Sequence, residues 1–102
     1  MPREPIHPGV ILADELAELC VSAAMLARDL DVPPNRISQI LAGKRAITAD
    51  TALRLGRWFG TSPHLWMNLQ KMYELDMAVL EHGQDIEANV PRGRAEAMRA
   101  LA

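Results

Sequence analysis

Three side chains that can hydrogen-bond to nucleic-acid bases lie close together in the middle of the chain: Asn35, Ser38 and Gln39. Amide side chains can pair bidentately with adenine in the major groove, and a serine hydroxyl can also contact a base edge. At about 100° per residue, these three point to one side of a helix, whereas Ile37 and Ile40 point to the other. A solvated helix face favours Glu and Lys instead. The spacing therefore predicts a helix that reads base edges.

Four residues around this helix are predicted to contact DNA phosphates: Ser22, Arg36, Lys44 and Arg45. Lys44 and Arg45 follow Gly43, a residue type that commonly ends a helix. Phosphate contacts fix the register of a protein on DNA without reading its sequence. We expect these residues to hold the duplex while the polar helix face discriminates bases.

The elements that position these groups are two short helices joined by a tight turn. Ser22 is a suitable N-cap for the first helix. Ala27 is small enough to allow close approach where the two helices cross. The run Asp31-Val32-Pro33-Pro34 ends the first helix, and Pro34 suits the first position of the second. This connection length is that of a helix-turn-helix.

The pattern of these residues resembles a known family. Ala27, Asp31-Val32, Ile37-Ser38 and Leu41-x-Gly43 resemble the phage-repressor-like (Cro/CI, or XRE) helix-turn-helix. The longer segments 7–16, 32–48, 50–70 and 73–75 are similar to the HigA-type antitoxins of type II toxin–antitoxin modules. Two positions depart from that family: Ala23 replaces a frequent Gln that contacts phosphate, and Asp31 replaces a usual Gly. Asp tolerates a left-handed backbone better than most residues.

The resemblance implies an all-α, five-helix phage-repressor-like helix-turn-helix domain with a short C-terminal extension. It also implies a DNA-binding antitoxin that neutralises a HigB-type mRNA-cleaving toxin and represses its own toxin–antitoxin operon. The expected partners are double-stranded operator DNA, that toxin and a second copy of the chain. Two alternatives stay open: a stand-alone XRE-type transcriptional repressor without a toxin, and a protein-binding module on the same fold, because a fold does not fix a function.

Three further helices are expected around the helix-turn-helix. The first begins at His7-Pro8-Gly9, with an inner stripe formed by Leu12, Leu16, Leu19 and Cys20. The fourth starts at Thr48 and ends at Gly60, and its buried side includes Leu53. Arg54 on this helix is expected to face solvent or phosphate.

The fifth helix, about residues 63–82, begins at Ser62-Pro63 and is expected to stop at Gly83. Its apolar residues are too widely spread for one packing face, so Met72, Leu75 and Val79 are candidate dimer-interface residues. The other possibility is that the helix is buried on two sides within one subunit. We thus expect a DNA-binding domain with its dimerisation helix in residues 1–83, and an extension in residues 84–102 that is disordered or a short helix.

Charge is distributed unevenly along the 102 residues, although the net charge is only −2. Residues 28–57 carry six basic side chains against three acidic ones, whereas residues 58–90 carry one lysine against five acidic side chains. The excess positive charge therefore coincides with the predicted reading helix, as expected for a nucleic-acid binder.

Composition argues against other classes of protein. Cys20 is the only cysteine, which excludes an intrachain disulfide and favours the cytoplasm. Neither a signal peptide nor an apolar run long enough for a membrane span is found, so no membrane partner is expected. His7, His64 and His82 are scattered, without metal-ligand spacing, and no glycine-rich phosphate loop occurs. We expect no catalytic site, no metal and no cofactor.

Overall fold

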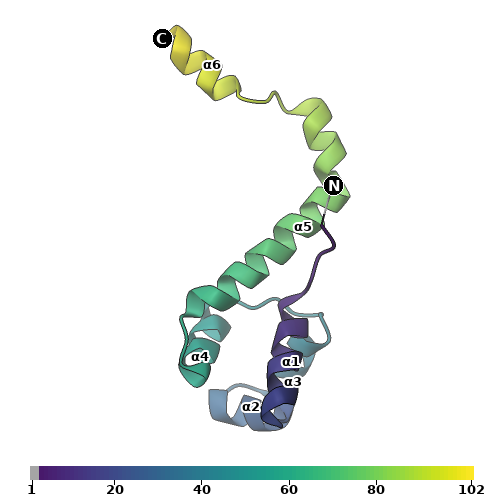
Figure 1. The fold of residues 1–102 in the computed structure, drawn as a ribbon, viewed down its shortest axis with the longest axis vertical. Helices are drawn as coiled ribbons and strands as arrows, with labels where there is room; N and C mark the ends of the chain where they lie inside the picture. The colour runs from purple at the N-terminus through teal and green to yellow at the C-terminus, as the bar shows by residue number, and fades with distance from the viewer. Residues whose placement is uncertain (1–2) are drawn as a thin grey trace.

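The computed structural model describes residues 3–102, which form six helices. In chain order these are α1 (Pro8–Leu19), α2 (Ala23–Leu30), α3 (Pro34–Leu41), α4 (Ala49–Phe59), α5 (Pro63–Asn89) and α6 (Arg94–Leu101). Residues 7–70, here called the head, contain α1 to α4 and the beginning of α5 (Figure 1). Residues 71–102, here called the arm, contain the rest of α5 and α6 and project from the head, so that the molecule measures 58 × 26 × 22 Å. The predicted all-helical fold and the five-helix arrangement are confirmed, with α6 as an addition.

Most helices in the head begin at a side-chain cap that the sequence identifies. Ser22 Oγ accepts a hydrogen bond from the Met25 backbone N–H at 3.1 Å. Thr48 and Ser62 cap α4 and α5 in the same way. Proline occupies the first turn of α1, α3 and α5, where a missing N–H costs nothing. The predicted helix starts at Pro34, Thr48 and Ser62 are therefore confirmed.

The first four helices end with a left-handed residue that lets the next N–H bond back into the helix. These residues are Cys20, Asp31, Gly43 and Gly60. At the turn of the helix-turn-helix, Asp31 has φ 57° and Val32 N–H donates to the Ala27 carbonyl at 3.0 Å. Asp31 thus adopts the backbone conformation that the sequence required of it. The predicted burial of Leu19 and Cys20 is wrong: Leu19 is 52% exposed at the last position of α1, and the role of Cys20 as a left-handed helix end places it on the surface.

A single apolar core holds the head together. Its buried side chains come from α1 to α5 and from the two connections around α3: Leu12, Leu16, Leu26, Ala27, Leu30, Val32, Ile37, Ile40, Ile47, Ala52, Leu55 and Trp66. The predicted burial of Leu53 is wrong, since Ala52 and Leu55 already face the core and Leu53 points away from it. Gly9 packs so closely on α3 that a Cβ there would collide with the Ile40 carbonyl oxygen. The start of α1 and the end of α3 are therefore fixed against each other.

The long helix α5 does not stop where the sequence predicted. It continues through Gly83 to Asn89, so the predicted end at residue 82 is wrong. A glycine inside a helix costs only about 1 kcal/mol relative to alanine, and Gly83 does not take the positive φ of a helix stop. The helix ends instead at Asn89, because the next residue, Val90, is extended before Pro91.

Of the expected extension, residues 84–89 continue α5 and residues 94–101 form α6, in which no residue is buried. At the other end of the chain, Arg3 reaches the arm and bonds to Asp76 at 2.9 and 3.2 Å. Within residues 3–102, none of the helices combines the length and the apolar character needed to cross a bilayer.

Candidate nucleic-acid interface

The helix α3 has the two faces that its sequence predicted. Ile37 and Ile40 are fully buried against the head, whereas Asn35 and Ser38 are exposed. The Ser38 hydroxyl donates to the Asn35 carbonyl at 3.3 Å, in an exposed bond between neighbouring residues of α3. The structure therefore presents the predicted base-reading side chains to solvent on a helix whose other face is anchored.

Gln39 is half-buried and is held by the loop that follows α3. Its Oε1 accepts a hydrogen bond from Arg45 Nε at 2.8 Å. An amide oxygen has two acceptor sites, so this oxygen can keep Arg45 and still receive a second donor. Two of the predicted DNA-contacting residues are thus brought together, and the Gln39 amide is oriented before any ligand arrives.

The predicted phosphate contacts lie on two sides of α3. Lys44 and Arg45 are exposed in the loop directly after it. Ser22 is exposed at the start of α2, and its oxygen is already used as the helix cap. The backbone N–H groups at a helix start carry partial positive charge, which favours an anion there. This geometry allows a contact with the DNA phosphate backbone at the start of α2 and another in the loop after α3.

The loop that carries Lys44 and Arg45 is anchored to α5 at its far end. Gln70 is a buried polar residue, and its Oε1 accepts the Ile47 backbone N–H at 2.8 Å. Its Nε2 donates to Glu74 Oε2 at 3.2 Å. An unpaired buried N–H is costly, so Gln70 fixes where the loop re-enters the head.

His7 braces the start of α1 next to the same loop. Its Nδ1 accepts the Gly9 N–H at 2.9 Å, and its ring lies edge-on to Tyr73 with centroids 4.9 Å apart. Burial lowers the pKa of His7, and a bond to the Arg45 backbone carbonyl opposes that shift only in part. The predicted role of His7 as a turn residue is thus a specific one, since it caps a helix.

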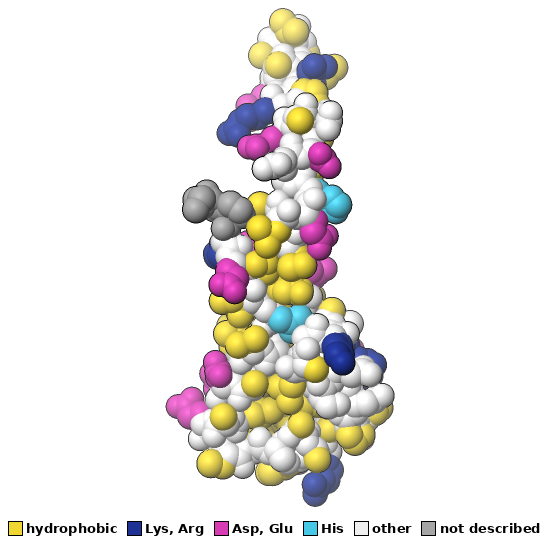
Figure 2. Space-filling model, turned by 90° about the vertical axis from the view of Figure 1, so that its right-hand side faces the viewer, with side chains coloured by type: hydrophobic (Ala, Val, Ile, Leu, Met, Phe, Trp, Pro, Cys, Tyr) yellow, Lys and Arg dark blue, Asp and Glu magenta, His cyan; other side chains and the backbone are white. Residues whose placement is uncertain are grey.

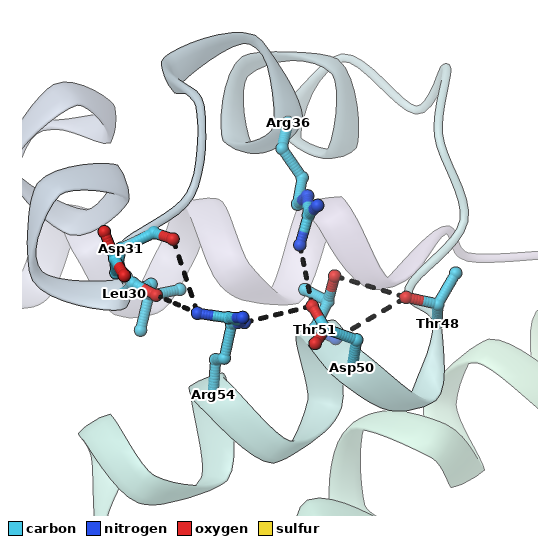
Figure 3. Close-up of polar contacts among 7 residues, drawn as sticks. All are labelled: Leu30, Asp31, Arg36, Thr48, Asp50, Thr51 and Arg54. Atoms are coloured by element: carbon cyan, nitrogen blue, oxygen red, sulfur yellow. Dashed lines mark hydrogen bonds and ion pairs between the residues drawn. The ribbon is translucent and has the colours of Figure 1, made fainter.

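Two of the six basic residues counted in this region form ion pairs within the protein (Figure 3). Arg36 Nη1 lies 2.7 Å from Asp50 Oδ2, and Arg54 Nε lies 3.0 Å from the same oxygen. The bond from Arg54, and secondarily that from Arg36, holds the pKa of Asp50 below its usual range. The charge available to DNA is therefore smaller than the sequence count suggested.

Arg54 is the functional residue whose role the sequence reading missed. Its Nη1 donates to the Leu30 carbonyl at 2.8 Å and to the Asp31 carbonyl at 3.3 Å, at the end of α2. The sequence predicted only a contact with solvent or phosphate; the side chain is 38% exposed, but it also satisfies carbonyls that a helix end leaves unpaired. The spacing of Asp50 and Arg54, four residues apart on a helix, was the signal for their pairing.

The arm carries the predicted dimer-interface residues. Met72, Leu75 and Val79 are 45%, 60% and 50% exposed on α5. Figure 2 shows hydrophobic side chains gathered along the middle of the long helix on one side of the molecule. Their exposure leaves an apolar surface without cover inside the chain. The alternative of a helix buried on two sides within one subunit is therefore wrong for this part of α5.

Comparisons with known proteins agree with this arrangement. A helix-turn-helix family model matches residues 12–66. An addiction module antidote protein of a HigA family from Coxiella burnetii has a similar structure, with a TM-score of 0.86 and 52% identity over 87% of this chain and 98% of that one.

Two further proteins are similar over most of their length. The structure of Pseudomonas aeruginosa antitoxin HigA with the higBA promoter gives a TM-score of 0.85 and 47% identity over 87% of this chain and 98% of that one. Virulence-associated protein I of Dichelobacter nodosus is 51% identical over 74 residues, which are 72% of this chain and 68% of that protein. Within residues 3–102, no group of three His, Cys, Asp or Glu side chains is placed to hold a metal ion.

Proposed function

This chain belongs to the helix-turn-helix family, whose members are regulators and not enzymes, and we propose that it is a sequence-specific DNA-binding antitoxin. The observation that carries the proposal is the exposed polar face of α3 above a fully buried apolar face. A helix with this division can enter the major groove while the head stays folded behind it.

At the DNA, Asn35, Ser38 and Gln39 contact base edges in this proposal. Lys44 and Arg45 hold phosphates on one side of α3, and Ser22 with the start of α2 holds one on the other. Arg45 also orients Gln39, so the same loop residue contacts the DNA phosphate backbone and positions a side chain that contacts a base.

Two copies of the chain bind the operator together. Met72, Leu75 and Val79 form the contact between them, because these apolar residues are exposed on α5 and a symmetric dimer buries the same patch on both subunits. A dimer also places two reading helices on half-sites about one helical turn apart. Replacing Leu75 by Glu is expected to yield monomers in sedimentation analysis, while Glu87→Gln, an exposed change farther along α5, leaves the dimer intact.

The cellular partner in this proposal is a HigB-type mRNA-cleaving toxin, which the chain neutralises while it represses the shared operon. Support comes from the similarity to HigA-family antitoxins, one of them solved with promoter DNA. The test is co-expression with the product of an adjacent small open reading frame, followed by purification through a tag on this chain. A stable complex, with growth rescued in cells that the neighbour alone arrests, is the expected result.

The outcomes of that experiment separate the rival functions. Without a complex or toxicity, but with specific DNA binding, the chain is a stand-alone repressor. If it also binds no DNA in a low-salt titration, a protein-binding module remains, which the net charge of −2 favours.

The DNA-binding half of the proposal is tested by two substitutions. Gln39→Ala is expected to cost about 1–3 kcal/mol of specific binding and to relax preference at one base. Lys44→Ala is expected to weaken binding to all sequences alike and to reduce the salt dependence by about one phosphate contact. An unchanged specific affinity in Gln39→Ala contradicts the assignment of the α3 face.

A further inference from the structure

Asp50 lies where the three helices α2, α3 and α4 meet (Figure 3). Its Oδ2 accepts from Arg36 of α3 at 2.7 Å and from Arg54 of α4 at 3.0 Å. Arg54 continues to the two carbonyls at the end of α2. Asp50 thus joins α3 to α4 through Arg36, and Arg54, which shares the same carboxylate oxygen, joins α4 to the end of α2.

We propose that Asp50 determines DNA specificity by acting through Arg36, which it keeps as a brace inside the protein and withholds from DNA phosphates. Asp50 and Arg54 are then positioning residues, and Arg36 is not the phosphate contact that the sequence suggested. This inference rests on the proposed DNA-reading function and names residues that control it without touching bases.

The contacts favour a role in orientation over one in stability. The Arg36 side chain is 27% exposed and that of Asp50 is 55% exposed, and ion pairs so open to solvent contribute little to folding. Hydrogen bonds between ions are nevertheless short and directional, so they fix geometry. Arg36 lies on α3 one residue after Asn35, and holding its guanidinium limits how α3 can turn.

Withholding Arg36 also matters for discrimination. A guanidinium that is free to bind phosphate strengthens binding to every sequence, because phosphate contacts carry no sequence information. Two guanidinium groups that share one carboxylate oxygen would also repel each other if its charge were removed. Loss of the Asp50 charge is therefore expected to loosen α3 and release a cation at the same time.

The experiment compares two DNA duplexes. One is the sequence that the unsubstituted protein enriches from a randomised pool, and the other is a scrambled duplex of the same composition. In Asp50→Asn, binding to the enriched duplex is expected to weaken and binding to the scrambled duplex to strengthen or stay equal, so that the affinity ratio falls roughly tenfold. The slope of log affinity against log salt concentration is expected to steepen by about 0.9, as for one added phosphate contact.

A matched control removes the effect of net charge. Asp14→Asn changes the charge by the same unit at an exposed position of α1. It is expected to change the affinity for both duplexes alike and to leave the affinity ratio unchanged. Asp50→Glu keeps the negative charge and is expected to retain most of the ratio.

Two variants of Arg36 test the route through that residue. Arg36→Gln is expected to lower the affinity ratio with no loss of salt slope, unlike Lys44→Ala. The double variant Asp50→Asn, Arg36→Gln is expected to return the steepened slope to that of the unsubstituted protein. A merely structural role of Asp50 would move thermal unfolding and leave these slopes alone.

Two results overturn the inference. One is a decrease of the salt slope by about 0.9 in Arg36→Gln, as expected if Arg36 already contacts phosphate. The other is an affinity ratio between the two duplexes that is the same in Asp50→Asn as in Asp14→Asn. Failure of the unsubstituted protein to enrich any duplex overturns the proposed DNA reading itself. Enrichment with an unchanged Asp50→Asn ratio overturns only the role of Asp50.

Discussion

The head and the arm contain similar apolar side chains but use them differently. Every hydrophobic residue of the core belongs to the head, between Leu12 and Trp66. The arm exposes most of its large apolar residues: Met72, Leu75, Val79, Leu80, Ile86, Val90, Met98 and Leu101. Burial therefore depends on whether a second element is present to cover a helix face, and in the arm only the side of α5 near Tyr73 and Asp76 receives such contacts, from His7 and Arg3. We therefore propose that the exposed apolar residues of the arm contact a partner, whereas those of the head stabilise the fold.

The largest expected effect tests this difference with one kind of substitution at two places. Leu12→Ala in the head is expected to destabilise folding by about 2–5 kcal/mol, because Leu12 is fully buried and its loss leaves a cavity. Leu75→Ala in the arm is expected to change the free energy of unfolding by no more than about 0.5 kcal/mol, measured by denaturation of dilute, monomeric protein. Equal losses at both sites would show that the arm folds against the head.

A polar pair of substitutions on α5 gives the next effect. Gln70→Ala is expected to cost about 1–3 kcal/mol, since it leaves the buried Ile47 N–H without its acceptor. Gln84→Ala on the exposed arm part of the same helix serves as the control and is expected to be near neutral. Urea denaturation of the two variants measures the difference. A neutral Gln70→Ala would mean that the loop after α3 is not anchored by this bond.

The cap of α1 is expected to contribute less. His7→Ala is expected to cost about 1 kcal/mol, the usual value of an N-cap side chain, measured by thermal unfolding at neutral pH. His82→Ala on the exposed arm is the matched control and is expected to leave the unfolding midpoint unchanged.

The same residue makes the head sensitive to pH. Burial lowers the pKa of His7 in the folded state below the unfolded value of about 6.5. The unfolded chain therefore binds the proton more readily, so the contribution of His7 is full above about 6.5 and is lost as pH falls toward the folded pKa. His7→Asn keeps a capping oxygen and is expected to flatten the pH dependence of stability below about 6.5. A slope identical to that of the unsubstituted protein would assign the dependence to other groups.

The sequence predicted the local features of the fold well. Helix starts depend on residues within one turn, such as the caps Ser22 and Thr48 and the proline at position 34. They can therefore be predicted without tertiary information. Arg54 was misjudged because its carbonyl partners lie more than twenty residues away. Gly83 was misjudged because its residue type permits a helix stop but does not require one.

The same distinction holds for the candidate site. The periodicity of α3 predicted which side chains are exposed, since it follows from the helix itself. It did not predict that Arg36 pairs with Asp50 and that Arg45 pairs with Gln39. Such pairs depend on how the loop and α4 return to α3, which the sequence pattern alone does not give.

The smallest expected effect concerns α6. A chain that ends at Gly93 is expected to have a free energy of unfolding within about 0.5 kcal/mol of that of the full chain at any fixed, dilute concentration. The reason is that none of the removed residues is buried. An isolated helix of this length is marginal in water. The measurement is thermal unfolding across a range of protein concentrations. If truncation lowers the midpoint only at high concentration, α6 takes part in self-association, since binding stabilises the folded state by mass action. If it lowers the midpoint equally at all concentrations, α6 supports the head directly, and the division between head and arm fails.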